Sequence, residues 1–445
     1  MRLLAPAAAA PRLLWQPRGS GASGELTPSA RGALCFPGDL VRYSFRLPPP
    51  APGERWGGTY AIRTDAWRGP WIRLADDPPA GETWRFLLLS DHQQLPGTAA
   101  TMRAVRNHLA HTPCQGILFP GDCVAWPDER THWCGHPQQL GFFDSLGAPG
   151  WAGATRLTAA QSPLSALPIW AAPGNHDVSG PPESGSPAER FERVALGRWQ
   201  IETFHRLLLA DGAPPWYRVR VGPLDLISLF VARRYARGDH AARRGPCYEP
   251  PGRFIFAPIT PGAEQHTWLC SQVSERPDEE ACGARSGGEP RAVRDAGLRV
   301  VQLHHPPYAQ GINAWPPFGE PVAYREHQII AHLVPVIAPW ADLVCGGHNH
   351  AVNHHRIDGV DYFESSHIGC GHPPYERLSN GEPAPEPDGH PSAFFRTSPA
   401  TTFFSELEVP AAARSARAIV RTWEVEPDGE ARLVYRFTCG ATGGA

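Results

Sequence analysis

The chain contains no lysine, so all 41 of its basic residues are arginine. We give this absence no functional weight, because a GC-rich coding bias explains it. The chain also lacks a large excess of positive or negative charge, since 41 basic and 44 acidic side chains leave a formal net charge of -3. Such a chain has no electrostatic footprint for nucleic acid or for an acidic membrane surface. An anionic substrate would have to be held by local groups.

Paired cysteines and long apolar runs are also absent from the sequence. The ten cysteines include no C-x-x-C pair, which excludes zinc-ribbon spacing, although Cys114, Cys123 and Cys134 are close enough for a loop disulfide. No apolar run in the sequence approaches the roughly 18 consecutive residues that a membrane span needs. Pro6 and Pro11 interrupt the N-terminal apolar stretch before a signal-peptide core builds up. We expect no membrane segment, and a cytoplasmic location is favoured over a secreted one.

Turn-forming residues, in contrast, are abundant. The 50 Pro and 45 Gly, with 19% charged residues, predict many structured loops in one large domain and a smaller one. Residues 1–30 are rich in Ala, Pro, Gly and Ser without periodicity, which predicts a mobile tail. Alternating polar and apolar residues within 31–80 predict a small β module or an extra sheet. Residues 81–440 are expected to form the main domain, with long loop insertions.

Five short apolar runs from residue 84 onward each end in a cluster of polar side chains. Helical spacing of apolar residues occurs between or beside them, at 99–110, 189–209, 264–275 and 325–337. Alternating strands and helices predict an α/β fold, in which ligands gather at the carboxyl ends of the strands. We therefore expect the five clusters to meet at one edge of a sheet. Segments 216–235 and 416–438 are predicted to be β-hairpins.

The polar clusters share oxygen and imidazole donors. The candidate metal ligands are Asp91, Gln93, Asp122, Asn175, His304, His348 and His350. Such donors suit Mn, Fe or Zn better than a thiolate site would. Seven donors are too many for a single ion with an open position, so the set predicts two ions close together. Asp122, alone on a glycine-containing turn, is the natural bridge between them.

The spacing within two clusters supports this sharing. In an extended chain, side chains at positions i and i+2 point the same way, while the residue between them points to the opposite side. Asp91 is therefore expected to converge with Gln93, and His348 with His350. The residue between each pair should face elsewhere.

The order of the motifs is itself informative. They are Asp91-His92-Gln93, Gly121-Asp122, Gly174-Asn175-His176-Asp177, His304 followed by His305-Pro306, and Gly347-His348-Asn349-His350. These motifs closely resemble those of the calcineurin-like metallophosphoesterase superfamily, over roughly residues 84–370. The resemblance implies a four-layer αββα sandwich of two mixed sheets with helices outside, to which the small N-terminal β module is added.

The same resemblance implies a role for each site residue. One metal would be held by Asp91, Gln93, Asp122 and His350, and the other by Asp122, Asn175, His304 and His348. His176 would face the substrate rather than bind metal, with Asp177 as its hydrogen-bond partner, and these two are the catalytic candidates. Gln93 stands where the family usually has histidine. Ala125 stands where purple acid phosphatases have their tyrosine, so no purple colour is expected.

The implied function is a dinuclear metal-dependent phosphoesterase that hydrolyses phosphate mono- or diesters by attack of a metal-bridging hydroxide. Its cofactors would be two divalent or trivalent ions (Mn, Fe or Zn), and its partner a small-molecule or phosphorylated substrate. The alternative is a catalytically weak metal-binding scaffold that recognises a phosphorylated partner, which the neutral Gln93 favours. His305 is expected to point away from His304, and residues 364–372 either line the pocket or form a solvated loop. Substrate identity, oligomeric state and compartment stay open.

Overall fold

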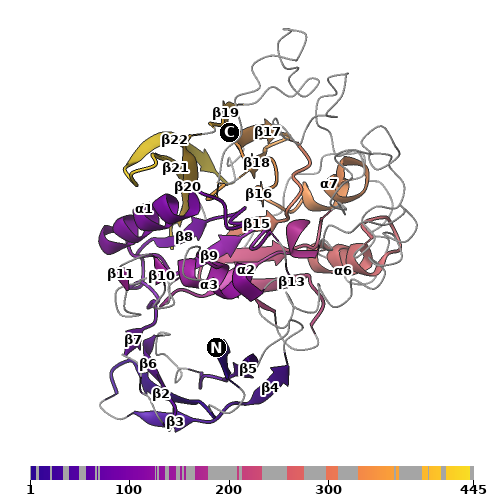
Figure 1. Ribbon diagram of the computed structural model, residues 1–445. Coiled ribbons are helices and arrows are strands. Elements are labelled where there is room, and N and C mark those ends of the chain that lie inside the picture. Colours follow the sequence, from indigo (N-terminus) through magenta and orange to yellow (C-terminus); the bar gives the residue numbers. More distant parts are fainter. Residues whose placement is uncertain are drawn as a thin grey trace, which may run out of the picture.

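Two large mixed β-sheets face each other in the computed structural model of the chain (Figure 1). The described residues are 2–6, 10–20, 23–33, 40–49, 57–65, 68, 71–125, 127, 130–135, 140–146, 151–152, 155–156, 166–178, 208–209, 213–232, 258–274, 297–308, 329–364, 367–369, 393–398, 400–411 and 417–440. The fold is of the α/β class, with few helices beside the two sheets.

The first sheet has the strand order β12-β9-β8-β20-β21-β22. Its strands are β8 (Trp84–Leu88), β9 (Gly116–Phe119), β12 (Ile169–Ala171), β20 (Thr402–Val409), β21 (Ala418–Val425) and β22 (Ala431–Cys439). The strands β8, β9 and β12 run parallel, whereas β20 pairs antiparallel with β8 and continues into the antiparallel hairpin of β21 and β22.

The second sheet has the strand order β13-β14-β15-β16-β18-β17-β19. Its strands are β13 (Tyr217–Val221), β14 (Leu224–Ser228), β15 (Leu298–Gln302), β16 (Leu343–Gly346), β17 (Val352–Ile357), β18 (Val360–Glu364) and β19 (Phe394–Arg396). The strands β14, β15, β16 and β18 are parallel, and the other three pair antiparallel at the two edges.

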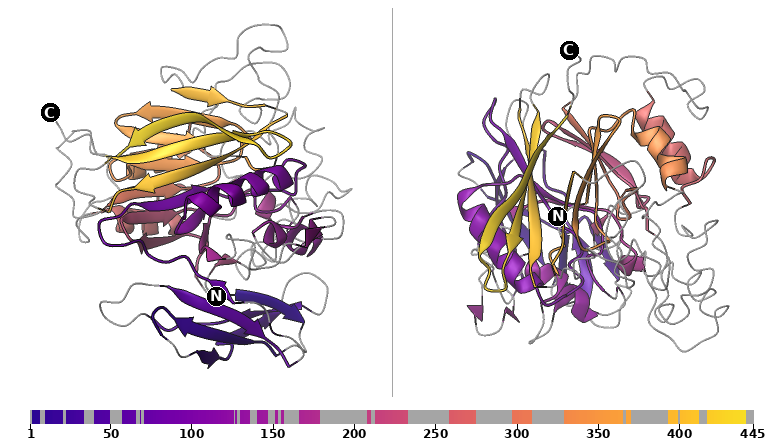
Figure 2. Two further views of the ribbon diagram at one scale, coloured as in Figure 1. Left: turned by 90° about the vertical axis from the view of Figure 1, so that its left-hand side faces the viewer. Right: turned by 90° about the horizontal axis from the view of Figure 1, so that it is seen from above.

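The central strands of both sheets are buried on both faces, which explains the continuous apolar runs of the sequence. Successive side chains of a strand point to opposite faces. Phe86 and Leu88 accordingly contribute to the core between the sheets, while Leu87 packs on the outer face with the residues of α1 (Thr98–His111). Likewise, Val300 faces the inner core, and Val301 packs outward in the cluster that includes residues of α6 (Glu264–Val273) and α7 (Val334–Ile337). The helices thus lie on the outer sides of the two sheets (Figure 2).

The predicted strands and helices within the described residues are confirmed. The five runs that end in polar clusters are β8, β9, β12, β15 and β16. The two hairpins are β13–β14 and β21–β22, and the helical segments correspond to α1, to α6, and to the π-helical turn η6 (Ile329–Leu333) followed by α7. The short helices α2 (Arg130–Cys134) and α3 (Phe142–Ser145) complete the first outer layer. The predicted helix 189–209 lies outside the described residues, apart from 208 and 209.

One expectation about the strands is wrong. The clusters do not follow strands of a single sheet, because β8, β9 and β12 belong to the first sheet and β15 and β16 to the second. The carboxyl ends of both sets nevertheless meet, since the backbone N–H of His348 after β16 donates to Asp91 after β8. The site is therefore built where two facing sheets end together.

The N-terminal residues form two small sheets rather than the predicted mobile tail. One consists of β1 (Arg2–Pro6), β4 (Ala30–Ala33) and β5 (Leu40–Ser44), and the other of β2 (Arg12–Pro17), β3 (Gly24–Leu26), β6 (Gly58–Arg63) and β7 (Ile72–Arg73). The partners of β1 and of β2 include β5 and β6, beyond residue 40, so local periodicity within 1–30 could not reveal the pairing. A further short pair is formed by β10 (Trp151–Ala152) and β11 (Thr155–Arg156).

Two other sequence expectations concern thiols and membranes. Cys114, Cys123 and Cys134 are all free cysteines, so the loop disulfide that their spacing allowed is not formed. Within the described part of the chain, no helix has both the length and the apolar character needed to cross a membrane.

Candidate metal centre

The first and the last motif come together at Asp91, directly after β8. Both carboxylate oxygens of Asp91 accept the backbone N–H of His348, each at 3.1 Å, and the Ser90 hydroxyl donates to one of them. The imidazole Nε2 of His350 lies 3.5 Å from Asp91 Oδ1. Gly347 must lack a side chain here, because a Cβ would lie 2.5 Å from Asp91 Oδ2. The turn after β16 is thus fitted against Asp91.

Asp122 lies in the middle of the cluster, on the turn after β9. Its Oδ1 accepts the backbone N–H of His176 at 2.9 Å, and its Oδ2 lies 3.3 Å from His304 Nε2. The Gln93 side-chain amide also donates to Oδ2. The preceding Gly121 has φ of +96°, and a Cβ there would lie 2.6 Å from His304 Nδ1. Glycine is therefore required for the close approach of Asp122 and His304.

Asn175, which follows β12, faces two imidazoles with one oxygen atom. Its Oδ1 lies 2.9 Å from His304 Nε2 and 3.0 Å from His348 Nδ1. His304 Nδ1 lies 2.8 Å from the carbonyl oxygen of Pro120, and this contact requires a proton on Nδ1. In the neutral ring, the lone pair on Nε2 then faces oxygens of Asn175 and Asp122, an arrangement that a bound cation would satisfy.

Two of these three groups hold the protonation state that a bound cation needs. Burial lowers the pKa of His304, but the Asp122 and Asp91 carboxylates and the Pro120 carbonyl together outweigh it and raise that pKa to about 9, so His304 has to lose a proton before it can bind a cation. Conversely, burial raises the pKa of Asp122, whereas His304 and His176 hold it below its usual range. Burial lowers the pKa of His348 well below its ordinary value, and repulsion from His305 and His304 lowers it further. A neutral His348 and an ionised Asp122 are the forms that coordinate metal.

Backbone strain is concentrated at the same residues. Of the eight non-glycine residues with positive φ in the described chain, five are predicted ligands. They are Asp91 (54°), Gln93 (41°), Asp122 (58°), His348 (85°) and His350 (54°). Such a conformation costs roughly 1–2 kcal/mol per residue and is typical of functional sites. The side chains therefore converge through left-handed turns, and the expectation of an extended chain at Asp91–Gln93 and His348–His350 is wrong.

The two residues between these pairs do face elsewhere, as predicted. His92 Nε2 lies 2.7 Å from the Ser145 hydroxyl, and burial lowers the pKa of His92 to about 3. Asn349 donates through its backbone N–H and its side chain to Glu364. Neither side chain points at the cluster.

The partner of Asp177 differs from the expectation. Its carboxylate accepts three backbone N–H groups, those of Asp122 at 2.9 Å, Gly174 at 2.8 Å and Val124 at 3.2 Å. Burial, and next the repulsion from Asp122, raise the pKa of Asp177 to about 8, which these N–H donors oppose. The ring of His176, in the 3-10 helix η3 (His176–Val178), instead has its Nδ1 3.3 Å from the Ala125 carbonyl oxygen. Asp177 thus joins the β9 and β12 turns and does not orient His176.

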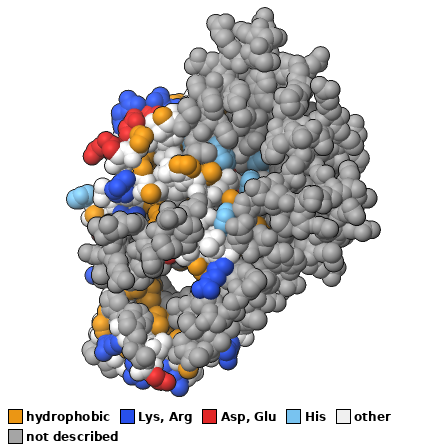
Figure 3. Space-filling model, in the orientation of Figure 1, with side chains coloured by type: hydrophobic (Ala, Val, Ile, Leu, Met, Phe, Trp, Pro, Cys, Tyr) orange, Lys and Arg blue, Asp and Glu red, His pale blue; other side chains and the backbone are white. Residues whose placement is uncertain are grey.

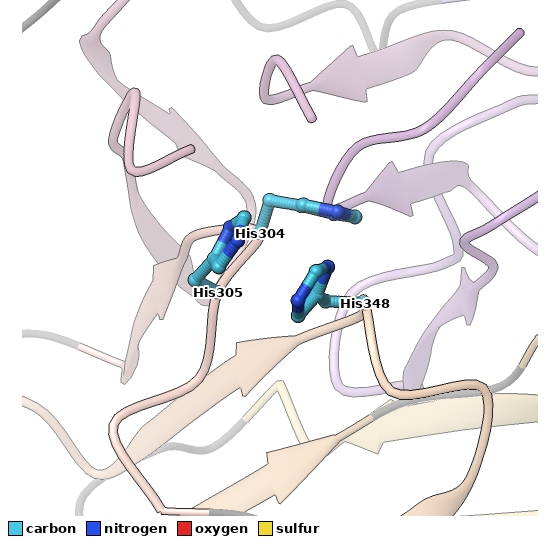
Figure 4. A group of neighbouring side chains, drawn as sticks. All are labelled: His304, His305 and His348. Atoms are coloured by element: carbon cyan, nitrogen blue, oxygen red, sulfur yellow. The ribbon is translucent and has the colours of Figure 1, made fainter. Parts of the chain in front are cut away.

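His305 was expected to point away, but it lies in the cluster. Its ring stacks on that of His348, with centroids 3.8 Å apart and an interplanar angle of 27°. His304 comes from the same loop after β15, and the three imidazoles converge (Figure 4). In the described chain, donor atoms within 4.8 Å of one another occur in two groups, Asp91-Asp122-His304 and His304-His305-His348. No spacing rule in the sequence indicated the second group, since adjacent residues usually diverge.

The cluster as a whole contains all nine predicted site residues, and all nine are described. Several histidine side chains are visible together near the middle of one face of the molecule (Figure 3). Carboxylate, amide and imidazole donors around Asp122 fit a site for borderline ions such as Mn, Fe or Zn. The roles of these residues as metal ligands stay predictions.

Comparisons with known proteins bear on the fold. No protein-family model matches the chain, and no curated protein does either. Among solved structures, a purple acid phosphatase from yellow lupin (Lupinus luteus) seeds matches with a TM-score of 0.58 at 13% identity, covering 98% of this chain and 71% of that one. The GAP50 anchor protein of the Plasmodium inner membrane complex matches at 13% identity with a TM-score of 0.44. That match covers 80% of this chain and 88% of the GAP50 chain.

The lupin enzyme and this chain thus share their topology. Identity of 13% shows the fold alone. The match includes both facing mixed sheets, since it covers 98% of this chain. The chain has the calcineurin-like metallophosphoesterase fold.

Proposed function

We propose that this protein is a dinuclear metal-dependent phosphoesterase that hydrolyses phosphate mono- or diesters of a small-molecule or phosphorylated substrate. The observation that carries the proposal is the position of Asp122. One of its oxygens lies 3.3 Å from His304 Nε2, and His304 and His348 both lie within 3.0 Å of Asn175 Oδ1. A second set, Asp91 and His350, approaches to 3.5 Å. Asp122 and Gln93, which are hydrogen-bonded, are the candidates to complete it.

The four-layer αββα arrangement is part of this proposal. It is supported by α1 on the outer side of the first sheet and by α6 and α7 on the outer side of the second. The two sets of donors would each hold one Mn, Fe or Zn ion, with Asp122 shared. When bound, such a pair of ions activates water as a nucleophile and neutralises the phosphoryl oxygens.

The protein residues would position and assist the reaction. Asp91 and Asp122 place their carboxylates in a buried site, where electrostatic interactions are stronger than in water. His176 is partly buried at the start of η3, and the Ala125 carbonyl accepts from its Nδ1, which orients the ring. With a second proton on Nε2, this imidazole can donate to the leaving-group oxygen or stabilise the charge that develops.

The test begins with metal-depleted protein. Mn, Fe and Zn are restored separately, bound metal is measured by plasma mass spectrometry, and turnover is followed with an aryl phosphate monoester and a diester. We expect bound metal and metal-restored hydrolysis of at least one ester. Protein that binds no transition metal, or that binds metal without hydrolysing either ester, contradicts the proposed activity.

A substitution at the shared carboxylate sharpens this test. Asp122→Asn keeps the shape but removes the charge, so we expect loss of at least one metal and a fall in turnover of roughly a hundredfold or more. The matched control is Asp225→Asn in β14, whose carboxylate is 2% exposed and pairs with Arg218 at 2.6 Å, outside the cluster. That variant should keep its metal content, even if its stability falls.

A second candidate function is a metal-binding scaffold that recognises a phosphorylated partner without hydrolysing it. The observation that favours it is the Gln93 amide, which donates to Asp122 and so occupies an oxygen that would otherwise face metal. Retained metal with no hydrolysis across a panel of monoesters and diesters, together with measurable binding of a phosphopeptide, would support the scaffold over the enzyme.

A further inference from the structure

Glu364 is a buried carboxylate for which the proposed chemistry has no use. It is the last residue of β18 and is 1% exposed. In the sheet it lies beside Gly346, the last residue of β16, and beside Asn353 in β17. The segment between β16 and β17 carries His348 and His350, so Glu364 sits next to both ends of the turn that presents them.

Within the described residues, the hydrogen bonds of the Glu364 carboxylate go to this turn and to the strand that follows it. Oε1 accepts the backbone N–H of Asn349 at 2.6 Å. Oε2 accepts the side-chain amide of Asn349 at 3.3 Å and that of Asn353 at 2.5 Å. One carboxylate thus connects the middle of the turn to the beginning of β17.

The turn needs such a connection. His348 and His350 have φ of 85° and 54°, a conformation that costs each of them roughly 1–2 kcal/mol. Asn349 between them is fully buried, and a buried backbone N–H without an acceptor would add a further penalty. Glu364 Oε1 is the acceptor that this N–H finds.

The turn is held from both sides as a result. On one side, the N–H of His348 donates to Asp91, and on the other the N–H of Asn349 donates to Glu364. With the backbone fixed at both points, His348 Nδ1 faces Asn175 and His350 Nε2 faces Asp91.

We propose that Glu364 is a positioning residue of the metal centre: it holds the His348-Asn349-His350 turn in its left-handed conformation and so sets both imidazoles for metal binding. The inference rests on the proposed function. It assigns to Glu364 no contact with substrate and no contact with metal.

The test measures metal affinity and stability separately. Mn²⁺ binding to metal-depleted Glu364→Ala and Glu364→Gln is measured by isothermal titration calorimetry, and denaturant unfolding is measured in the presence of a chelator. We expect the alanine variant to lose about tenfold or more in Mn²⁺ affinity, as is usual for removal of a group that orients ligands. Glutamine can still accept from Asn349 but places an amide against that of Asn353, so it should lose less.

A control separates positioning from a general loss of stability. Glu424 in β21 is also buried, at 4% exposed, and its carboxylate accepts from Thr401 at 3.0 Å and Arg396 at 2.6 Å. Glu424→Gln should lower the stability of the metal-free protein while leaving Mn²⁺ affinity within about twofold of the wild type, because mutations at distant sites are usually independent.

The outcomes are distinguishable. Wild-type Mn²⁺ affinity in a folded Glu364→Ala protein overturns the inference and leaves the proposed function intact. If the alanine variant does not fold, the glutamine variant decides, and an affinity equal to that of Glu424→Gln overturns the inference. Wild-type protein that binds none of Mn, Fe and Zn overturns the proposed function, and the inference falls with it.

Discussion

His176 binds Asp122 through its backbone N–H, at 2.9 Å, and not through its ring. His176→Ala keeps that N–H, so we expect both metals to remain bound. Turnover of an aryl phosphate should fall by about a hundredfold or more, which is the usual effect of losing a general acid. Plasma mass spectrometry and initial rates check the two halves of this prediction.

Either half can fail on its own. Loss of metal from His176→Ala would mean that the imidazole supports the ligands, and an unchanged rate would remove His176 from the chemistry. The result therefore also tests whether a His176 ring that is oriented by the Ala125 carbonyl, and not by Asp177, can act as a general acid.

In the proposed dinuclear centre, Gln93 would make one metal site weaker than the other. Its amide is neutral and donates to Asp122 Oδ2, whereas His304 and His348, which both lie close to Asn175, would supply imidazoles to the other site. Gln93→His supplies a stronger donor at this position, and we expect the affinity for the more weakly bound Mn²⁺ to rise about tenfold. Two-step calorimetric titrations of the wild type and the variant measure this directly.

The neighbouring Gln94 offers a matched control for that substitution. Its amide donates to the carbonyl oxygens of Thr131 and Leu140, so Gln94→His changes the same side-chain chemistry one position away without a ligand role. It should leave both Mn²⁺ affinities unchanged. A rise in the control but not in Gln93→His would argue against Gln93 as a ligand.

At this scale the sequence predicted most of the side chains that converge, with His305 as the exception, but not what each one contacts. Motif order is enough to select Asp91, Asp122 and Asn175, because metal chemistry restricts the residue types. The partners of Asp177 are three backbone N–H groups, and those of Glu364 include the backbone N–H of Asn349, and no residue type encodes such contacts. These contacts could be found only once the turns were seen.

Among the structural elements, the turn between β12 and η3 lies directly against Asp122. A Cβ on Gly174 would lie 2.1 Å from Asp122 Oδ1 and 2.3 Å from the Asp122 backbone nitrogen. Gly174→Ala therefore has to displace Asp122 or its own turn. We expect a loss of about 1–3 kcal/mol in the free energy of unfolding, together with weaker Mn²⁺ binding.

Denaturant unfolding and calorimetry measure these two effects. Gly24→Ala in β3 is a suitable control, because the nearest atom to its added Cβ would be 4.0 Å away and its φ is not in the left-handed region. The control should unfold like the wild type. Undiminished Mn²⁺ affinity in Gly174→Ala would mean that Asp122 can move without consequence for the centre.

The strands and helices were predictable, whereas their grouping into sheets was not. The apolar runs at β8 and β15 are alike, because each strand buries both faces. The assignment to different sheets depends on pairings such as that of Leu88 with Ser405, more than 300 positions along the chain. Local patterns carry no information about such long-range pairing, so a single sheet edge was the simplest expectation.

On the scale of the whole molecule, the N-terminal sheets stand apart from the two large ones (Figure 2). They enclose a core of their own, and its buried members are Leu13, Trp15, Tyr43, Phe45 and Tyr60. The three other clusters of buried apolar side chains contain no residue from this part of the chain. A separate core is the usual property of an independent domain.

Removal of residues 1–80 should for this reason leave the metal centre intact. No predicted ligand lies in the deleted part, and β8 begins at Trp84, beyond it. A backbone hydrogen bond from Ala75 to Ala166, at 3.0 Å, would be lost with the module. We expect soluble protein with Mn²⁺ affinity and aryl phosphate turnover within about twofold of the full chain, as measured by calorimetry and initial rates. An insoluble product, or one that has lost metal binding, would mean that the small sheets belong to the folding unit of the large ones.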